Sequence, residues 1–176
     1  MNDDGELLGR LVDAAREGDD LAVQELVRRT QPVMWRLCSA LGSEGETDDL
    51  VQDTYLRALG SLPTYRGDGP VIAWLSSIAR RVCADHVRGR VRHRRMVDAL
   101  CLNVDDLSVT APGNPTRDLL ASIDPDRREA FVLTQVAGLS YEEAAAVLDC
   151  PIGTIRSRVA RARADLMAEV RAAEAS

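Results

Sequence analysis

Lysine is absent from this sequence: all 22 of its basic side chains are arginine. Aromatic residues are scarce too, at 3% of the chain, so a hydrophobic core must be built from Leu, Val, Ile and Ala. Such a composition favours helices packed on helices. No segment of any length shows the alternation of apolar and polar residues that is typical of a strand, and we therefore expect an all-α fold.

Long apolar runs are missing as well. No segment approaches the roughly 20 apolar residues of a membrane-spanning helix, and the acidic N-terminus MNDDGELL does not resemble a signal peptide. The sequence also contains no Gly-rich phosphate loop, nucleophile elbow or metal-ligand cluster. We expect a cytoplasmic protein with no membrane insertion, no cofactor and no enzymatic activity of its own.

Cysteine and histidine offer two weak alternatives. Cys83 and His86 lie three residues apart in a predicted helix, and His93 follows seven residues later, which suggests a metal site, but no second close pair completes it. Asp85 beside His86 could be an acid–base pair, yet neighbours in a helix point about 100° apart. In a reducing cytosol the four cysteines are most simply small buried side chains: Cys38, Cys83, Cys101 and Cys150.

The net charge of −6 conceals two basic segments. Residues 80–95 contain seven arginines and one aspartate, and residues 150–171 contain five arginines and two acids. An arginine-rich helix face is often only solvated, and cations also favour helix C-termini. The density in residues 80–95 exceeds what a helix terminus needs, so we interpret the two segments as two contacts with nucleic acid.

The stretch from Leu139 to Arg163 has the pattern of a helix-turn-helix. Ser140 and Glu143 can form a capping box at the start of a short helix, and Asp149 begins a tight turn. Pro151 suits the first position of a second helix. An apolar stripe in that second helix is predicted to be buried: Ile152, Ile155, Val159, Leu166 and Val170. The second helix of such a motif enters the major groove of DNA.

The first part of the chain also reads as helices. We expect helices between residues 7 and 42, with a break at Gly18 and a kink or split at Pro32. Thr47 is predicted to cap a third helix. The second helix has less regular apolar spacing, and the groups that it offers for burial are Leu21, Leu26, Val27, Val33, Trp35 and Leu37.

A loop over residues 65–70 precedes a long helix that is expected to reach residue 95, with Val87 among its buried residues. The periodic pattern then dissolves until helical spacing resumes at residue 117. We predict two small helical domains, residues 1–95 and 117–176, joined by a flexible linker, residues 96–116, with the helix-turn-helix in the second domain.

Together these segments resemble the extracytoplasmic-function (ECF) sigma factors, the compact two-domain branch of the sigma-70 family. DDLVQDTYLRAL resembles the polymerase-clamp-binding helix of that family, and WLSSIARRVCADHVR resembles its promoter-melting helix. LSYEEAAAVLDCPIGTIRSRVARAR resembles its second-domain DNA reader. Three motifs in the right order, spread over nearly the whole chain, are more specific than any one of them.

The resemblance implies a bacterial RNA polymerase sigma factor, which directs core polymerase to specific promoters and initiates transcription. The first domain would be sigma region 2-like and would dock on core polymerase through Asp49, Gln52 and Asp53. It would also recognise and melt the minus-ten element. A loop at residues 65–69 could hold one flipped base, and the strand's phosphates would be held by Arg80, Arg81, Arg88 and Arg92.

The second domain would be sigma region 4-like and would read duplex DNA at the minus-thirty-five element. Arg156, Ser157 and Arg161 are expected to contact bases or phosphates, and the amides near Gly153 and Thr154 lie where a helix N-terminus attracts a phosphate. Many relatives are held inactive by an anti-sigma factor. The implied partners are therefore core RNA polymerase, promoter DNA and an anti-sigma factor.

Several residues depart from the expected patterns: Arg81, Asp149, Ala160 on the DNA-facing surface, where relatives often have a larger side chain, and Pro70 and Ile72 at the loop-to-helix junction. Arg81 stands where the promoter-melting helix commonly has asparagine, which favours a phosphate contact over base capture. Asp149 replaces the glycine that is common in helix-turn-helix turns, although Asp tolerates the left-handed region better than most residues.

One alternative function stays open. A helix-turn-helix transcriptional regulator that does not bind core polymerase would explain residues 117–171. It would leave the helix that follows Thr47 and the first basic segment without a role.

Overall fold

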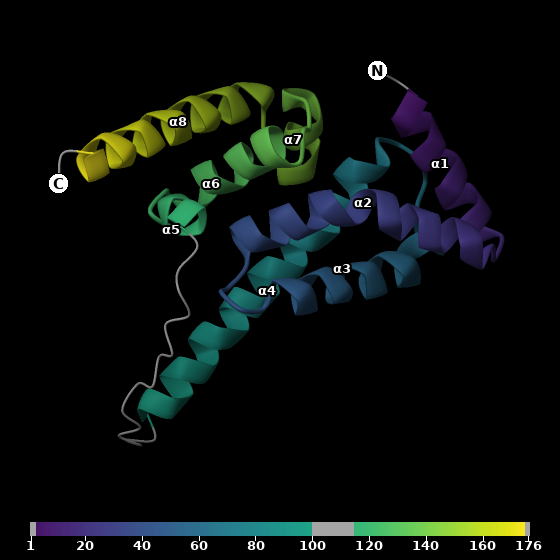
Figure 1. The fold of residues 1–176 in the computed structure, drawn as a ribbon, viewed down its shortest axis with the longest axis horizontal. Coiled ribbons are helices and arrows are strands. Elements are labelled where there is room, and N and C mark those ends of the chain that lie inside the picture. The colour runs from purple at the N-terminus through teal and green to yellow at the C-terminus, as the bar shows by residue number, and fades with distance from the viewer. Residues whose placement is uncertain (1–2, 100–114, 175–176) are drawn as a thin grey trace.

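The computed structural model describes residues 3–99 and 115–174, and in these ranges the chain is helical with no strand (Figure 1). The all-α prediction is confirmed. The first group contains α1 (Asp3–Arg16), α2 (Asp20–Leu41), α3 (Thr47–Ser61), the short 3₁₀ turn η1 (Leu62–Thr64) and α4 (Val71–Ala99). The second group contains α5 (Pro115–Ala121), α6 (Pro125–Phe131), the π-helical turn η2 (Val132–Val136), α7 (Tyr141–Leu148) and α8 (Ile152–Glu174).

The core of the first group lies where α2, α3 and α4 pack on one another. Met34 and Leu37 of α2 are fully buried there, as are Leu50 of α3 and Leu75 of α4. Burying such aliphatic side chains stabilises a fold by about 1.5–3 kcal/mol each. This core fixes the faces that α3 and α4 turn to solvent.

The break between α1 and α2 is confirmed. Gly18 has a φ of +93°, a conformation that glycine adopts more easily than other residues, and it ends the first helix. The carboxylate of Asp19 then accepts hydrogen bonds from the amides of Leu21 and Ala22, at 2.8 and 3.2 Å, and so caps α2.

The prediction that Pro32 splits the second helix is wrong, because α2 is continuous from Asp20 to Leu41. Proline removes one backbone donor from the helix, at a cost of about 3 kcal/mol. Thr30 and Met34 on either side of it are fully buried, so packing stabilises the helix across the proline. The predictions that Leu21 and Trp35 are buried are also wrong: they are 74% and 44% exposed.

Thr47 does not cap the third helix. Glu46 occupies the N-cap position and makes no side-chain capping bond. Its carboxylate instead lies 2.8 Å from the His86 ring nitrogen Nε2 and 3.3 Å from Nη1 of Arg90, both on α4. Thr47 is thus the first residue of α3, and the side chain at the N-cap position pairs with another helix instead of capping.

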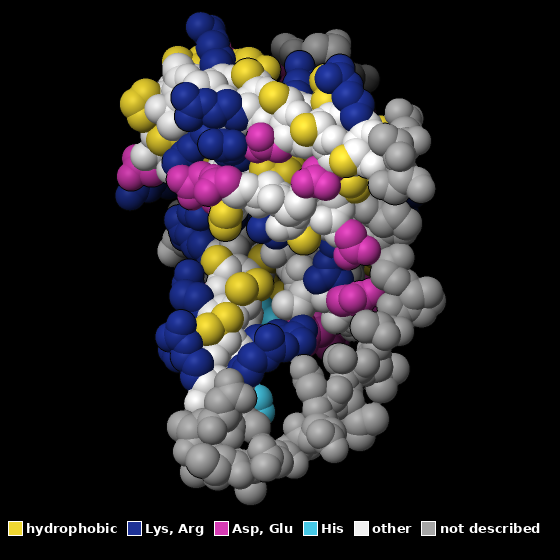
Figure 2. Space-filling model, turned by 90° about the vertical axis from the view of Figure 1, so that its left-hand side faces the viewer, with side chains coloured by type: hydrophobic (Ala, Val, Ile, Leu, Met, Phe, Trp, Pro, Cys, Tyr) yellow, Lys and Arg dark blue, Asp and Glu magenta, His cyan; other side chains and the backbone are white. Residues whose placement is uncertain are grey.

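The fourth helix continues through Ala99, four residues beyond the predicted boundary at residue 95. Its C-terminal half projects past the helices that cover its start (Figure 1). Val87 is 40% exposed rather than buried, for that reason. Figure 2 shows arginine side chains in a column over the lower half of the molecule, with hydrophobic side chains between them. The part of the predicted linker at residues 100–114 lies outside the described residues.

The helix-turn-helix is formed by α7 and α8. The hydroxyl of Ser140 accepts from the Glu143 amide at 3.1 Å, and the Glu143 carboxylate accepts from the Ser140 amide at 2.7 Å, so the predicted capping box is confirmed. Asp149 ends α7 in the left-handed region, with φ +49° and ψ +52°. Ile155, Val159 and Ala162 of α8 are buried, and the cap and turn thus fix how α8 packs.

Two details of the second helix differ from the prediction. Pro151 precedes the helix as its cap and is not its first residue, because its carbonyl accepts the first helical bonds from Thr154 and Ile155, at 2.8 and 3.3 Å. Of the predicted buried stripe, Ile152 and Leu166 are only half-buried, and Val170, near the end of α8, is 43% exposed because the stripe continues beyond the residues that cover it.

The two groups of helices contact each other directly. The turn η2 packs against α2, and α7 packs against α4. Nη1 of Arg80 lies 3.3 Å from the Glu129 carboxylate, and Nη2 of Arg117 donates to the Gly42 carbonyl at 3.0 Å. These polar contacts tie the start of α4 and the end of α2 to the second group.

Candidate nucleic-acid interface

One face of α4 carries a row of arginines. Arg81, Arg88 and Arg92 follow one another at intervals of seven and four residues, which places them on the same side of a helix. Trp74, seven residues before Arg81, lies on that side too. All three arginines are exposed, and Trp74 is half-buried. From Trp74 to Arg92 the face is about 27 Å long, at 1.5 Å per residue.

The cations of this row differ in their partners. Nη2 of Arg88 donates to Asp85 at 2.6 Å, and Nη1 of Arg57 in α3 donates to the same carboxylate at 2.9 Å. Arg57 and then Arg88 lower the pKa of Asp85, which stays ionised. Within the described ranges Arg81 and Arg92 form no ion pair, and they are available for an external anion.

Arg80 does not join this row. It lies about 100° around α4 from Arg81 and faces the second group of helices. Its side chain and that of Glu129 are 26% and 27% exposed, and the two form the ion pair described above. The structure therefore separates Arg80 from the three other arginines that were predicted to hold the melted strand.

The loop predicted to hold a flipped base lies at the N-terminal end of the same face. Residues 66–70 are exposed, whereas Tyr65 is half-buried and its ring contacts that of Trp74. Gly67 has a φ of +75°, which favours glycine at the crest of the loop. Through Trp74 the loop thus adjoins the α4 face that carries the arginine row, a contact that residue spacing alone does not indicate.

A groove of about 380 Å³ lies between α2 and α3. Gln52 lines it, while Asp49 and Asp53 are exposed on α3 outside its lining. Leu56 is another lining residue and is 61% exposed. Leu56 was not predicted as a site residue, although a leucine beside the polar residues Gln52 and Asp53 of this helix could have indicated a contact surface.

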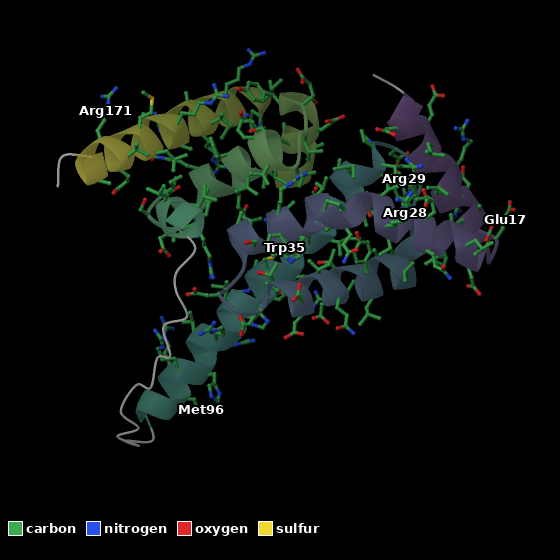
Figure 3. The ribbon with its side chains drawn as sticks, viewed as in Figure 1. Glu17, Arg28, Arg29, Trp35, Met96 and Arg171 are labelled. Atoms are coloured by element: carbon green, nitrogen blue, oxygen red, sulfur yellow. The ribbon has the colours of Figure 1, made fainter. Side chains whose placement is uncertain are left out.

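Trp35, which is labelled on α2 in Figure 3, is linked to this groove through Asp48. Its indole Nε1 donates to Asp48, in the first turn of α3, at 3.1 Å. Asp48 lines the groove. The exposed Trp35 ring therefore extends this surface toward the N-terminus of α3, and no sequence pattern indicated that contact.

Helix α8 presents Arg156, Ser157 and Arg161 to solvent, as predicted. Two neighbouring arginines have structural partners: Arg158 bonds to Asp126 of α6, and Arg163 Nη2 donates to the side chain of Gln135 at 2.8 Å. In the described part of the chain, Arg156 and Arg161 form no side-chain hydrogen bond or ion pair. Half of the arginines in this stretch of α8 are thus anchored and half are free to bind.

The N-terminus of α8 offers one free amide of the predicted pair. The amide of Thr154 donates to the Pro151 carbonyl at 2.8 Å, so the expectation that it attracts a phosphate is not supported. The Gly153 amide has no acceptor among the described residues, and Gly153 is exposed. An added β-carbon at Gly153 would meet no atom within 4 Å, and the backbone there is open to an approaching ligand.

Cys83 and His86 have different partners in the part of the chain that the structure describes. Residues 3–99 and 115–174 contain no group of three His, Cys, Asp or Glu side chains that could hold a metal ion. Cys83 is buried beside Cys38, and this contact together with burial raises the pKa of the Cys83 thiol. His86 faces Glu46 instead.

None of the helices in the described ranges combines the length and the apolar character that crossing a bilayer requires.

Comparison with known proteins places family domains on both groups of helices. The family model described as Sigma-70 region 2 matches residues 26–96, and the one described as Sigma-70, region 4 matches residues 114–166. The first range contains α3 and most of α2 and α4, and the second contains α7 and the N-terminal part of α8.

Curated relatives match along most of their length. The chain is 41% identical over 171 residues to the probable RNA polymerase sigma-C factor of Mycobacterium bovis, covering 94% of this chain and 92% of that protein. It is 31% identical over 169 residues to the ECF RNA polymerase sigma-E factor of Escherichia coli K12, covering 87% and 88%.

Two solved structures share the fold. CnrH in complex with the cytosolic domain of CnrY has a TM-score of 0.71 and 31% identity, covering 92% of this chain and 96% of that one. The sigma factor RpoE of Bartonella quintana, in complex with the anti-sigma factor NepR, has a TM-score of 0.69 and 30% identity, covering 84% and 95%.

An α-helical protein with a region 2 unit, a region 4 helix-turn-helix and such relatives is an RNA polymerase sigma factor. The chain belongs to the extracytoplasmic-function sigma factors of the sigma-70 family. It directs core polymerase to specific promoters and initiates transcription. The alternative, a regulator that never binds polymerase, does not account for the region 2 match.

Proposed function

We propose that the two helical groups act as separate domains, residues 1–95 and 117–176, that bind two elements of one promoter. The main support is the distribution of unpaired cations. Arg81 and Arg92 on α4 and Arg156 and Arg161 on α8 are exposed, whereas several neighbouring arginines have partners. Unpaired, exposed cations on helix faces are suited to bind phosphates or base edges.

The face of α4 would hold the separated strand at the minus-ten element. Arg81, Arg88 and Arg92 would bind successive phosphates, while the loop at residues 65–69 would receive an unstacked base. Arg80 would reach DNA only after Glu129 moves away, because the two side chains are paired in this arrangement.

Helix α8 would read duplex DNA at the minus-thirty-five element. Arg156, Ser157 and Arg161 would face the major groove, and the Gly153 amide would bind a phosphate at the helix N-terminus. If Arg156 contacts a guanine, Arg156→Ala should weaken promoter binding by about 1–3 kcal/mol and relax specificity at one base pair. Arg92→Ala should instead weaken binding to all sequences and lower the salt slope by about 0.7, as expected for one phosphate of a single strand.

The acidic side of α3 would dock on core polymerase. Asp49 and Asp53 would meet basic groups, and the adjoining groove, which contains Gln52 and Leu56, would take apolar side chains. An apolar patch beside charged residues is typical of a protein interface.

Capture of core polymerase by immobilised chain tests this docking. Asp53→Arg should weaken the complex, because it reverses a charge on the docking face. Glu17→Arg, which makes the same change in the exposed turn after α1, should leave the affinity unchanged (Figure 3). Equal affinities of the two variants would place the polymerase contact elsewhere.

We further propose that the chain works in the cytoplasm and has no catalytic activity of its own, with polymerase supplying the chemistry. An anti-sigma factor would control it. The similar structures CnrH–CnrY and RpoE–NepR support this proposal, since the second is a sigma factor bound to an anti-sigma factor. Such a partner should compete with core polymerase for the chain.

A further inference from the structure

The loop between η1 and α4 is closed by a single side chain. The hydroxyl of Tyr65 donates to the carbonyl of Gly69 at 2.7 Å, so the first residue of the loop is bound to its fifth. The Tyr65 amide also donates to the Leu62 carbonyl at 3.1 Å, which joins this residue to the preceding turn η1. Tyr65 therefore holds both ends of the segment.

The ring of Tyr65 also has a fixed partner. Its centroid lies 4.6 Å from that of Trp74, with an angle of 38° between the two planes. Trp74 belongs to the first turn of α4, where its amide donates to the Pro70 carbonyl at 3.1 Å. Both rings are half-buried and pack against the hydrophobic core. The loop is thus closed above an aromatic pair that a helix terminus keeps in place.

The rest of the loop is free to contact a ligand. Residues 66–70 are exposed, and a β-carbon added at Gly67 or Gly69 would meet nothing within 4 Å. Polar side chains, an open backbone and an aromatic floor are the features that bind an unstacked base. The same face of α4 continues from Trp74 into the row of Arg81, Arg88 and Arg92.

We propose that Tyr65 is a positioning residue for promoter melting: its hydroxyl holds the loop in the base-receiving conformation before DNA arrives. The proposal rests on the proposed role of this loop in binding the minus-ten strand. A loop that is already ordered loses less conformational entropy when a ligand binds, so closing it in advance raises affinity. Burial, with Asp13 and Asp68 nearby, raises the pKa of Tyr65, and the hydroxyl therefore remains a donor at neutral pH.

The substitution Tyr65→Phe removes only the hydroxyl and keeps the ring against Trp74. One net hydrogen bond corresponds to roughly a threefold to tenfold change in an equilibrium constant. We expect Tyr65→Phe to reduce base unstacking in the minus-ten strand by that factor. Affinity for core polymerase and binding to duplex minus-thirty-five DNA should be unchanged, because neither surface contains the loop.

Tyr55→Phe is a matched control. It also removes a tyrosine hydroxyl from the first group, one that lies 2.8 Å from Thr30 Oγ1 in the core. Tyr55 also lines the groove between α2 and α3, so the control is read at saturating core polymerase, where it should lower stability without changing base capture. The measurement is the fluorescence of 2-aminopurine, placed at each minus-ten position of the non-template strand, with holoenzyme at saturating core polymerase.

Three results are informative. A loss of fluorescence signal with Tyr65→Phe but not with Tyr55→Phe, at a melting temperature no lower than that of Tyr55→Phe, supports the proposal. Equal signals for Tyr65→Phe and the wild-type chain would overturn it and leave the proposed function intact. If the wild-type holoenzyme unstacks no base at any position, the role of the loop in melting is wrong, and the role of Tyr65 is wrong with it.

Discussion

The turn of the helix-turn-helix allows a sharp test, because Asp149 adopts a conformation that suits glycine. Its φ of +49° and ψ of +52° lie in the left-handed region, which costs an L-residue about 1–2 kcal/mol. Asp149→Gly removes that cost but adds about 0.4–1 kcal/mol of unfolded-state entropy to be lost on folding. The net expectation is a stabilisation of about 0.5–1 kcal/mol.

Thermal unfolding followed by circular dichroism measures this effect. For a chain of this size, a change of 1 kcal/mol shifts Tm by about 2–4 °C. Asp149→Asn should be close to neutral, since Asn also tolerates the left-handed region, whereas Asp149→Val should cost about 1–3 kcal/mol. Ala146→Gly, an exposed site within α7, should instead lower stability by about 0.5–1 kcal/mol.

The order of stability among these variants shows whether Asp149 is held in a left-handed conformation. If Asp149→Gly destabilises as much as Ala146→Gly does, Asp149 is not held in a left-handed conformation, and the turn that orients α8 has a different geometry. If Asp149→Asn is as harmful as Asp149→Val, the carboxylate charge matters more than the backbone.

Three further outcomes can be measured. Ser140→Ala should lower the free energy of unfolding by about 1 kcal/mol in a urea titration, because the capping box loses an acceptor; an unchanged midpoint would contradict the capping geometry. Arg28 and then Arg29 lower the pKa of Glu25 to about 2, so its stabilising contribution should be present above pH 4.5 and lost as the pH falls toward 2. An ordinary carboxyl titration of Glu25 by NMR would refute that pairing. Arg158→Ala should lower Tm with little effect on base specificity, since Arg158 bonds to α6; the reverse pattern would make it a DNA contact.

Features set by neighbouring residues could be predicted from the sequence. The capping box depends on residues three positions apart, the break before α2 depends on Gly18 and Asp19, and the all-α fold follows from composition and spacing. Local hydrogen bonding and backbone preference decide each of these.

Features set by distant partners could not be predicted. Arg80 belongs to a basic cluster in sequence, but Glu129 in the other group determines where it points. Glu46 fails to cap α3 because α4 takes its carboxylate. Periodicity did not reveal that Trp35 stays exposed beside Asp48, or that packing carries α2 past Pro32.

The same distinction applies to the candidate site. Sequence spacing identified the exposed residues of α8, since a helix wheel separates Arg156 and Arg161 from the buried stripe. It could not distinguish them from Arg158, whose partner Asp126 lies 32 residues earlier. The DNA-binding roles of Arg156 and Arg161 therefore stay predictions, and they rest on the absence of a partner for these two side chains among the described residues.

Transcription in vitro from a library of double-stranded promoters tests the central claim most directly. Core polymerase with this chain, and without any inhibitor, should make transcripts from a subset of templates that share two separated elements. Arg92→Ala should reduce all transcripts, and Arg156→Ala should change which minus-thirty-five sequences are used. Failure to start RNA synthesis from any template, or identical promoter choice with both variants, would contradict the account.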